Sequence, residues 1–338
     1  MALAGSALAG CGDTNPMVTP LPHWIVARSA AFLDVIDQVR KLAAFDMTVL
    51  VEGETGVGKE LVVRLLHYLS DRAANSFVPV NAGAVPDNLF ENELFGHVAG
   101  AYTGAQGASP GLVELADCGT LFLDEIDSLT PHAQAALLRF LQDRSYRPVG
   151  GRDVRRANIR IVVATNANLL ELTARGQLRK DLYFRLSGLR VKVPPLRERN
   201  DDIVPLAEHV LAGLNAEHPR IGKRRLGAAM RAWLVEQSWP GNVRELHSAV
   251  RRSFVMADGD EMQPPAGAVV APLADRGFRD AKAEAIQIFE RRFLDALMRE
   301  NRGNISQAAR TAGKERKSFD RLLRKHGIDS ARYRQLDG

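Results

Sequence analysis

The segment Gly53–Glu60 has residue types and a spacing that suit phosphate binding. It reads GETGVGKE, in which two glycines separated by four residues precede Lys59, and it follows an apolar run at residues 48–51 that predicts a strand. The glycines let backbone amides turn toward a phosphate, and the next helix N-terminus and the lysine add positive charge. Such a match also arises by chance in loops, so the strand before it matters. The expected nucleotide-binding residues are Gly53, Glu54, Thr55, Gly56, Val57, Gly58, Lys59 and Glu60.

A second segment could supply the hydrolytic chemistry. The apolar run at residues 121–123 predicts a strand and ends in Asp124 and Glu125. Asp124 would orient Mg²⁺ and its waters, and Glu125 would polarise the attacking water. Alone, the segment could equally be a strand that ends in a solvated acidic turn. Together with Lys59 it predicts a site that uses ATP and Mg²⁺, although Glu60 replaces the usual Ser or Thr ligand of the metal.

Between these two segments, residues 96–105 read GHVAGAYTGA. Gly100 and Gly104 give backbone freedom around Tyr102 and Thr103, which suits a loop that reorders with nucleotide state better than a packed one. Without its flanking sequence this stretch would support only a turn.

In its context the loop resembles the GAFTGA loop of bacterial enhancer-binding proteins, the AAA+ ATPases that activate RNA polymerase carrying sigma-54. That family has Phe where Tyr102 stands, so an aromatic ring is retained, and it shares the Glu60 departure. The resemblance covers residues 23–258 and 281–328. It implies that sigma-54 is contacted by Gly100, Ala101, Tyr102, Thr103, Gly104 and Ala105.

The resemblance also implies roles for polar residues at the ends of predicted elements. Asn81 resembles the asparagine that holds the catalytic glutamate in a switchable orientation, and Thr165 with Asn166 resembles sensor I, which detects the γ-phosphate. Arg244, in the segment GNVREL, resembles the sensor II arginine of the lid. Each could instead be a cap or a surface residue, but their order along the chain matches the family.

Two arginines in the segment QLRKDLYFRL, Arg179 and Arg185, are similar to the family's arginine fingers, which reach a neighbouring subunit. On one helix a six-residue spacing separates them by about 120° in projection, so we expect different roles. A salt bridge, for example to Asp181, is the alternative for one of them. Fingers that act between subunits require a ring, and the resemblance implies a hexamer.

The order of predicted elements divides the chain into five parts. Residues 1–22 are expected to be disordered. Residues 23–195 alternate strands with helices, which predicts a parallel sheet covered on both faces. Residues 196–258 read as helices only and are expected to form a lid. Residues 259–278 read as a linker, and residues 279–338 as a DNA-binding domain.

The last part is strongly basic. Residues 302–334 contain ten Lys and Arg against three Asp and Glu, a net charge of +7, whereas the whole chain carries +5 and the remainder about −2. Asn304 caps a short predicted helix, Gly313 makes a turn, and residues 314–326 form a second helix, an arrangement that resembles a Fis-like helix-turn-helix. A basic solvated helix is the alternative. The expected DNA contacts are Arg316, Lys317 and Ser318 to bases, Arg321 on the same basic face, and Arg324 and Lys325 to phosphates.

Cysteine content and hydropathy exclude several other classes of protein. Cys11 and Cys118 have neither disulfide-framework nor zinc spacing, and a reducing compartment fits best. Residues 8–11 resemble a lipoprotein processing site, but the ten residues before Cys11 contain no Lys or Arg and only a short apolar stretch, which argues against a signal peptide. Elsewhere no run of 18 apolar residues predicts a membrane span.

Together these features predict a cytoplasmic sigma-54-dependent transcriptional activator. Its expected fold is an α/β AAA+ P-loop ATPase with a helical lid, followed by an all-α helix-turn-helix domain. Its expected partners are the sigma-54 RNA polymerase holoenzyme, double-stranded DNA upstream of the promoter, and copies of itself. Because no N-terminal sensory domain is recognised, we expect regulation by a separate protein, a partner homologue or abundance.

Two rival functions differ from this one in specific residues. Another AAA+ machine, such as a clamp loader or an unfoldase, would lack the loop at residues 100–105. A plain repressor with a vestigial ATPase would have no need for the combination of Lys59, Asp124, Glu125, Asn166 and the candidate arginine fingers.

Overall fold

The computed structural model describes residues 21–102, 107–221, 223–265 and 303–326, together with residues 290, 293, 294, 297, 298, 300, 301 and 328. The chain forms two compact units, Met1–Ala268 and Val269–Gly338. The expectations for residues 1–20, Thr103–Ala105 and the linker beyond residue 265 lie outside the described residues.

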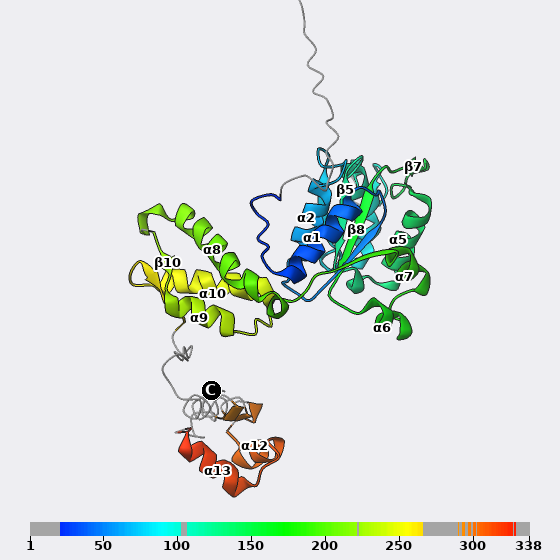
Figure 1. Ribbon diagram of the computed structural model, residues 1–338. Coiled ribbons are helices and arrows are strands. Elements are labelled where there is room, and N and C mark those ends of the chain that lie inside the picture. Colours follow the sequence, from blue (N-terminus) through cyan, green and yellow to red (C-terminus); the bar gives the residue numbers. More distant parts are fainter. Residues whose placement is uncertain are drawn as a thin grey trace, which may run out of the picture. The chain divides into compact units, whose positions relative to one another are not determined.

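A five-stranded parallel sheet forms the centre of the first unit (Figure 1). Its strand order is β2-β5-β8-β1-β9, and every neighbouring pair in it is parallel. This confirms the predicted α/β fold with a parallel sheet. The strands are β1 (Val49–Glu52), β2 (Phe77–Asn81), β5 (Thr120–Asp124), β8 (Arg160–Thr165) and β9 (Leu189–Lys192).

Helices cover both faces of the sheet because successive strand residues point to opposite sides. Val49 and Val51 pack in a cluster with the buried residues of α1 and α2. Leu50 packs in another cluster that contains residues of α3, α5 and α7. Figure 1 shows α1 and α2 on one side of the strands and α5 and α7 on the other. The helices are α1 (Ala30–Ala43), α2 (Lys59–Tyr68), α3 (Phe90–Phe95), α4 (Leu112–Leu115), α5 (Pro131–Asp143), α6 (Leu169–Ala174) and α7 (Lys180–Leu186).

Short elements connect these layers. Two antiparallel pairs project from the sheet domain, β3 (Gly96–His97) with β4 (Ser109–Pro110), and β6 (Ser145–Tyr146) with β7 (Arg155–Arg156). The 3-10 turns that precede the lid are η1 (Ala82–Ala84), η2 (Asp87–Leu89) and η3 (Ile126–Ser128).

The lid is mainly helical but also contains a small strand pair. Its helical elements are η4 (Leu196–Glu198), α8 (Asn200–Glu217), η5 (Pro219–Ile221), α9 (Ala228–Glu236) and α10 (Asn242–Met256). The expectation of helices only was wrong at β10 (Arg225–Leu226), which pairs in parallel with β11 (Glu261–Met262). β11 lies in the segment 259–278, so the expectation that this whole segment is a linker was also wrong. Two-residue strands carry no periodic signal, and their pairing depends on a contact between distant segments.

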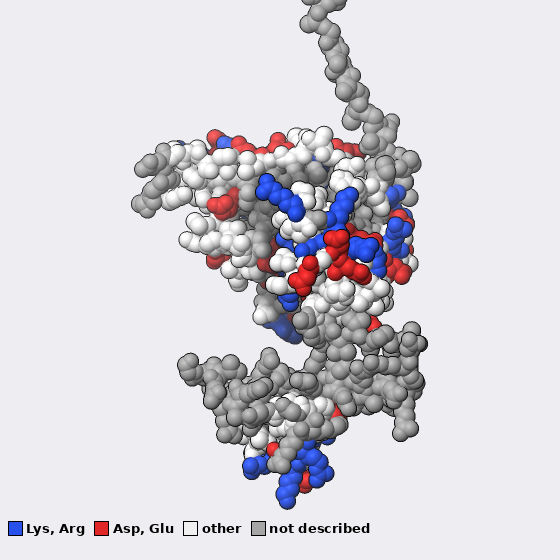
Figure 2. Space-filling view, turned by 90° about the vertical axis from the view of Figure 1, so that its left-hand side faces the viewer, with Lys and Arg blue, Asp and Glu red and all other residues white. Residues whose placement is uncertain are grey.

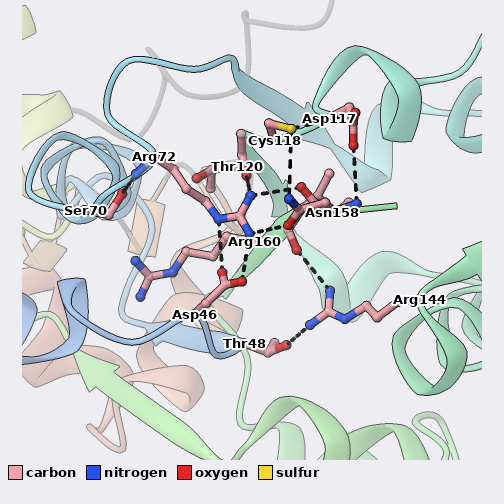
Figure 3. A network of polar contacts seen from close by, with 12 residues as sticks. Asp46, Thr48, Ser70, Arg72, Asp117, Cys118, Thr120, Arg144, Asn158 and Arg160 are labelled. Carbon is pink, nitrogen blue, oxygen red and sulfur yellow. Dashed lines mark hydrogen bonds and ion pairs between the residues drawn. The ribbon is translucent and has the colours of Figure 1, made fainter. Parts of the chain in front are cut away.

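A polar network closes the amino-terminal edge of the sheet (Figure 3). The Arg72 guanidinium donates to both Asp46 carboxylate oxygens and to the Asn158 backbone carbonyl and side-chain oxygen. Arg160, almost fully buried, donates to the carbonyl oxygens of Leu42 and Ala43 at the C-terminal end of α1. Burial lowers the pKa of Arg160 to about 10, so the side chain stays charged there at neutral pH. A cation at a helix C-terminus is favourable because it offsets the helix dipole.

A buried carboxylate ties the lid to the start of α1. Asp202 accepts hydrogen bonds from the backbone amides of Arg28 and Ser29, from the Ser29 hydroxyl at 2.7 Å and from Arg199 Nε at 2.9 Å. The Arg199 guanidinium lies 3.6 Å from the centroid of the Phe32 ring. Burial lowers the pKa of Arg199. The ion pair with Asp202 offsets the cost of burying the charged guanidinium.

In the second unit, two short helices pack through small and apolar residues. They are α12 (Ile305–Thr311) and α13 (Arg316–Lys325), with Gly313 at φ +61° in the turn between them. The Asn304 side chain caps α12 by accepting from the Gln307 amide. Ala308, Ala309, Phe319 and Leu323 are buried with Leu294, Leu297 and Met298. Of residues 279–302, which were expected to belong to the DNA-binding domain, residues 290, 293, 294, 297, 298, 300 and 301 are described.

Across the part of the chain described above, no helix is long and apolar enough to span a membrane.

We expect Asp202→Ala to destabilise the first unit by about 3–5 kcal/mol, because it leaves the buried Arg199 without its partner. The three tryptophans, Trp24, Trp233 and Trp239, all belong to this unit, so tryptophan fluorescence during urea unfolding measures the change. Glu114→Ala breaks an exposed ion pair with Arg155 and serves as the control, with an expected loss below about 1 kcal/mol. Similar losses in the two variants would contradict the assignment.

Candidate active site

A cavity of about 450 Å³ lies at the carboxyl ends of the central strands. That volume is in the range of small-molecule sites, about 300–1,000 Å³. Its walls come from the Gly53–Glu60 loop, the end of β5, the end of β8 and α10. The lining residues are Thr55, Gly56, Gly58, Lys59, Glu60, Asp124, Glu125, Asn166, Val243, Arg244, His247, Ser248 and Arg251.

Glycine geometry shapes the loop. Gly56 and Gly58 have φ values of +79° and +98°, in the left-handed region that other residues rarely adopt. A Cβ on Gly56 would also lie 2.5 Å from the carbonyl oxygen of Gly241 in the lid. Gly58 is the N-cap of α2, so the loop leads directly into a helix N-terminus, which favours an anion.

The Lys59 ammonium is held inside this loop. Its Nζ donates to the carbonyl oxygens of Gly53 at 2.9 Å and Glu54 at 3.3 Å. Burial lowers the pKa of Lys59, and the carboxylates of Asp124, Asp127 and Glu125 oppose that effect. The loop therefore concentrates positive charge beside the two acids predicted for catalysis.

These acids occupy a strained turn at the end of β5. Asp124 Oδ1 accepts from the Glu125 amide at 2.9 Å. Glu125 has φ +55° and ψ +45°, a left-handed conformation that costs on the order of 1–3 kcal/mol for a residue other than glycine. This turn directs the Glu125 side chain toward Gly83, where an added Cβ would lie 3.0 Å from Glu125 Oε2.

Asn81 lies next to the acids in the sheet. It ends β2 and is in register with Asp124. Its side-chain oxygen accepts from the Gly83 amide at 2.9 Å and caps η1. Among the described residues no hydrogen bond joins Asn81 to Glu125, although both side chains approach Gly83. The predicted glutamate-holding role of Asn81 therefore stays a prediction.

The two residues predicted for sensor I separate in space. Asn166 Nδ2 donates to Thr55 Oγ1 at 2.9 Å and lines the cavity. Thr165 is fully buried, donates to Asp127 Oδ1 at 2.5 Å and does not line the cavity. Only Asn166 is thus placed to reach a bound phosphate.

The lid contributes one helical face to the cavity. Arg244 lies there as predicted, and its backbone amide donates to the Gly56 carbonyl oxygen at 3.3 Å. The sequence analysis missed His247, Ser248 and Arg251, which line the cavity beside it. Their spacings of three, four and seven residues from Arg244 would have placed them on its face of a helix. Burial is the main cause of the lowered pKa of His247, and the neighbouring charges of Arg251 and His209 add to it.

Neither predicted finger lines the cavity of its own chain. Arg179 forms an exposed ion pair with Asp181 at 2.8 Å, the alternative raised for one of the two arginines. The assumption of a single helix was wrong, because Arg179 is the extended N-cap of α7 and only Arg185 lies inside the helix. The Arg185 guanidinium donates to the Leu141 carbonyl oxygen at the end of α5.

The Gly-rich loop extends from the β3–β4 pair. Gly96 has φ +74°, and a Cβ there would lie 2.4 Å from the Ser109 carbonyl oxygen, so the base of the hairpin requires glycine. Tyr102 is 48% exposed and its ring centroid lies 5.2 Å from that of His97. Thr103, Gly104 and Ala105 lie outside the described residues.

The donor set suits a hydrated magnesium ion better than a protein-enclosed one. Within the described ranges no group of three His, Cys, Asp or Glu side chains could hold a metal. Mg²⁺ usually keeps several waters and takes one or two carboxylates together with substrate phosphates. Asp124 lines the cavity and could be such a carboxylate, whereas Glu60 is paired with Arg64 at 2.7 Å.

In the second unit, the first residues of α13 form a basic exposed face. Arg316, Lys317, Ser318 and Arg321 are exposed, whereas Phe319 between them is buried. Figure 2 shows Lys and Arg side chains gathered on this unit. The side chains of Arg324 and Lys325 lie outside the described part of the structure.

Comparison with known proteins identifies both parts of the first unit. Residues 25–192 match the family described as the sigma-54 interaction domain, and residues 197–266 match the AAA+ ATPase lid domain. The chain is 38% identical over 324 residues to the regulatory protein AtoC of Escherichia coli K12, covering 91% of this chain and 68% of AtoC. It is 37% identical over 310 residues to the nitrogen fixation protein AnfA of Azotobacter vinelandii, covering 91% of this chain and 58% of AnfA. The chain thus spans only part of the length of these relatives.

Solved structures show the same fold. The crystal structure of NtrX from Brucella abortus superposes with a TM-score of 0.67 at 32% identity, over 90% of this chain and 69% of NtrX. NtrX in complex with ATP superposes with a TM-score of 0.66, also at 32% identity, over 91% of this chain and 70% of NtrX. The predicted fold class is therefore confirmed, and nucleotide is bound in a related structure.

We expect Lys59→Ala to abolish nucleotide binding, because the full charge that faces the phosphates is lost. Glu125→Gln should keep binding but slow hydrolysis by about 10²–10⁴-fold, the usual contribution of a general base. Titration with a fluorescent ATP analogue and phosphate release measure the two effects separately. Lys41→Ala, at an exposed position of α1, is the control for loss of a positive charge. Equal loss of binding in the first two variants would contradict these roles.

Proposed function

The chain belongs to the sigma-54-interacting family of AAA+ ATPases, and we propose that it is a DNA-bound activator that uses ATP hydrolysis to remodel sigma-54 RNA polymerase at a promoter. The observation that carries this proposal is the connection between the nucleotide cavity and the β3–β4 hairpin. Asn81, which is in register with the cavity-lining Asp124, and Gly96 at the base of the hairpin are joined by residues 82–95, which contain η1, η2 and α3.

Hydrolysis follows from the roles of the cavity residues. The Gly56–Gly58 amides, the N-terminus of α2 and Lys59 bind the phosphates of ATP. Glu125 accepts a proton from a water molecule that attacks the γ-phosphorus, and the bond between that phosphorus and the β–γ bridging oxygen breaks, which releases ADP and phosphate. Mg²⁺ held at Asp124 would neutralise charge on the phosphates. Asn166, bonded to Thr55, detects whether the γ-phosphate is present.

The hairpin tip is the proposed output. Glu125 and Asn81 both lie against Gly83, and the chain continues from there to the hairpin. A change in the Glu125 orientation on loss of the γ-phosphate would displace η1, and α3 would transmit the displacement to residues 100–105. The exposed Tyr102 then supplies apolar contact with sigma-54, while the added hydroxyl, relative to Phe, changes its polarity.

Ring assembly would complete the catalytic site. Arg179 and Arg185 lie outside the cavity of their own chain, as expected for side chains that act in the nucleotide site of a neighbouring subunit. The Arg185 guanidinium donates to a backbone carbonyl, and the Arg179 guanidinium donates to the exposed Asp181 carboxylate. We assign the finger to Arg179 or Arg185 of an adjacent copy in a hexamer.

The remaining parts of the chain follow the proposed division. Residues 23–195 form the ATPase subdomain, and residues 196–258 together with β11 form its lid. The rest of the segment 259–278 links the lid to residues 279–338, and residues 1–22 precede the ATPase. The α12–α13 pair would bind DNA as a Fis-like helix-turn-helix with α13 in the major groove. Because its substrate is polymerase on chromosomal DNA, the protein would act in the cytoplasm, under the control of a separate regulatory protein.

We expect Thr103→Ala to keep most ATP hydrolysis and to abolish sigma-54-dependent open-complex formation, because Thr103 belongs to the proposed output loop and not to the cavity. ATP turnover and transcription from a sigma-54 promoter are measured on the same reconstituted protein. Thr173→Ala, in α6, is the matched control. Full transcription by the Thr103 variant, or no transcription by the wild type, would contradict the proposal, whereas another AAA+ machine would not separate the two activities.

For the second unit, Arg316→Ala should weaken binding to the preferred DNA site by about 1–3 kcal/mol and relax its specificity if the side chain contacts a base. Lys325→Ala should instead weaken binding to all sequences similarly and lower the salt dependence, as expected for a phosphate contact. Fluorescence anisotropy with specific and random duplexes at several salt concentrations distinguishes them. A uniform loss in both variants would show that Arg316 does not contact a base.

A further inference from the structure

One buried amide joins the phosphate loop to the lid. Asn242 is completely buried at the start of α10. Its Nδ2 donates to Glu54 Oε2 and to the Thr55 carbonyl oxygen, both at 3.1 Å. Its Oδ1 accepts from the Leu196 backbone amide at 2.8 Å. The two ends of a single side chain are therefore bonded to segments separated by more than 140 residues.

These partners have separate tasks in the proposed ATPase. Glu54 and Thr55 belong to the loop that would hold the phosphates. Leu196 follows Pro194 and Pro195, the connection between the sheet domain and the lid. Asn242 itself begins the helix whose next turns bring Arg244, His247 and Arg251 to the cavity. A displacement of the lid must therefore pull on the phosphate loop through this amide.

The contact is reinforced by charge. The Arg197 guanidinium donates to both Glu54 oxygens, at 2.6 and 2.9 Å. The hydrogen bonds from Arg197 and Asn242 lower the pKa of Glu54 to about 2, so its carboxylate is ionised at neutral pH. Glu54 thus receives donors from η4 and α10, two separate elements of the lid.

The residue type at position 242 is restricted in two ways. Its φ of +54° is a left-handed conformation that Gly, Asn and Asp tolerate best. An amide is also required, because the same group must donate to the loop oxygens and accept from the Leu196 amide. Asp would keep the acceptor but place a second carboxylate beside Glu54.

We propose that Asn242 is a positioning residue that couples lid orientation to the conformation of the phosphate loop and thereby sets nucleotide affinity. This inference rests on the proposed ATPase function for its meaning, but the coupling itself is a property of the nucleotide-free protein. Because the loop contacts phosphates in the ground state and in the transition state alike, its displacement raises KM more than it lowers kcat.

The decisive variant is Asn242→Asp, with Asn242→Gly as a second variant that keeps the left-handed backbone and removes the side chain. We expect the Kd for ADP and the KM for ATP to rise about tenfold in each, as for loss of hydrogen bonds to a charged partner, with kcat changed less than about twofold. Asn215→Asp is the matched control, because Asn215 also bonds a backbone amide and a carbonyl, both of Arg224 inside the lid.

A double variant isolates the pair. In Asn242→Asp with Glu54→Gln, the like-charge contact between the two positions disappears, so the double variant should lose less affinity than the sum of the losses in Asn242→Asp alone and Glu54→Gln alone. Additive losses would overturn the proposed pairing with Glu54. Wild-type affinity in Asn242→Asp, or an equal loss in the Asn215 control, would overturn the positioning role.

Amide hydrogen exchange of the nucleotide-free protein keeps the two proposals distinguishable. Exchange at residues 53–58 should increase in both Asn242 variants and not in the Asn215 variant, whether or not ATP is hydrolysed. Unchanged exchange overturns the coupling. If the wild type binds and hydrolyses no nucleotide while the exchange increases, the proposed function fails and the coupling stands.

Discussion

The parallel register of the central strands is the constraint on which the candidate site depends. Because all strands run the same way, their carboxyl ends meet at one edge, and the pairs Asn81↔Asp124 and Glu52↔Thr165 bring residues from four strands together there. The opposite edge is closed by the Arg72 and Arg160 network, which leaves the carboxyl edge for chemistry. A shift of one residue in any strand would turn its polar end residue to the other face of the sheet.

A second constraint is the close approach of the lid to the phosphate loop. A Cβ at Gly56 would lie only 2.5 Å from the Gly241 carbonyl oxygen, so the absence of a side chain is what allows the two segments to touch. The Gly56 carbonyl accepts from the Arg244 amide, and Asn242 bonds the neighbouring residues of the loop. The loop is therefore held by backbone and side-chain amide contacts to the lid, and a change in the lid angle would disrupt them. Asp202 in α8 adds an attachment of the lid to the start of α1.

Features formed by residues close together in the chain could be predicted from the sequence, whereas features that depend on contacts between distant segments could not. The phosphate loop and the Asp124–Glu125 turn are each contained in fewer than ten consecutive residues, so the sequence alone was enough to predict their chemistry. His247 and Arg251 lay within reach of helical periodicity once Arg244 was assigned. Asn242, Asp202 and the β10–β11 pair could not be recognised, because each acts through a partner far along the chain. Arg179 shows a different limit: whether it lies in a helix or caps it is decided by one residue, and helix boundaries are the least certain part of any sequence-based prediction.

The distribution of strain indicates where the molecule can respond to a ligand. Among the described residues, five that are not glycine have positive φ: Cys118, Glu125, Arg144, Trp239 and Asn242. Three of these lie at or near the cavity: Glu125 follows β5, Asn242 bonds the Gly53–Glu60 loop, and the Trp239 carbonyl accepts from the Asn242 amide. A left-handed conformation of a residue other than glycine is unfavourable and persists only where surrounding contacts stabilise it. A ligand that alters those contacts can therefore change the backbone conformation at that residue. Glu125 depends on the turn beside Asp124, and Asn242 depends on the loop at Glu54 and Thr55. Phosphates bound between them would act on both at once, which would link the orientation of Glu125 to the position of the lid without a direct contact between the two.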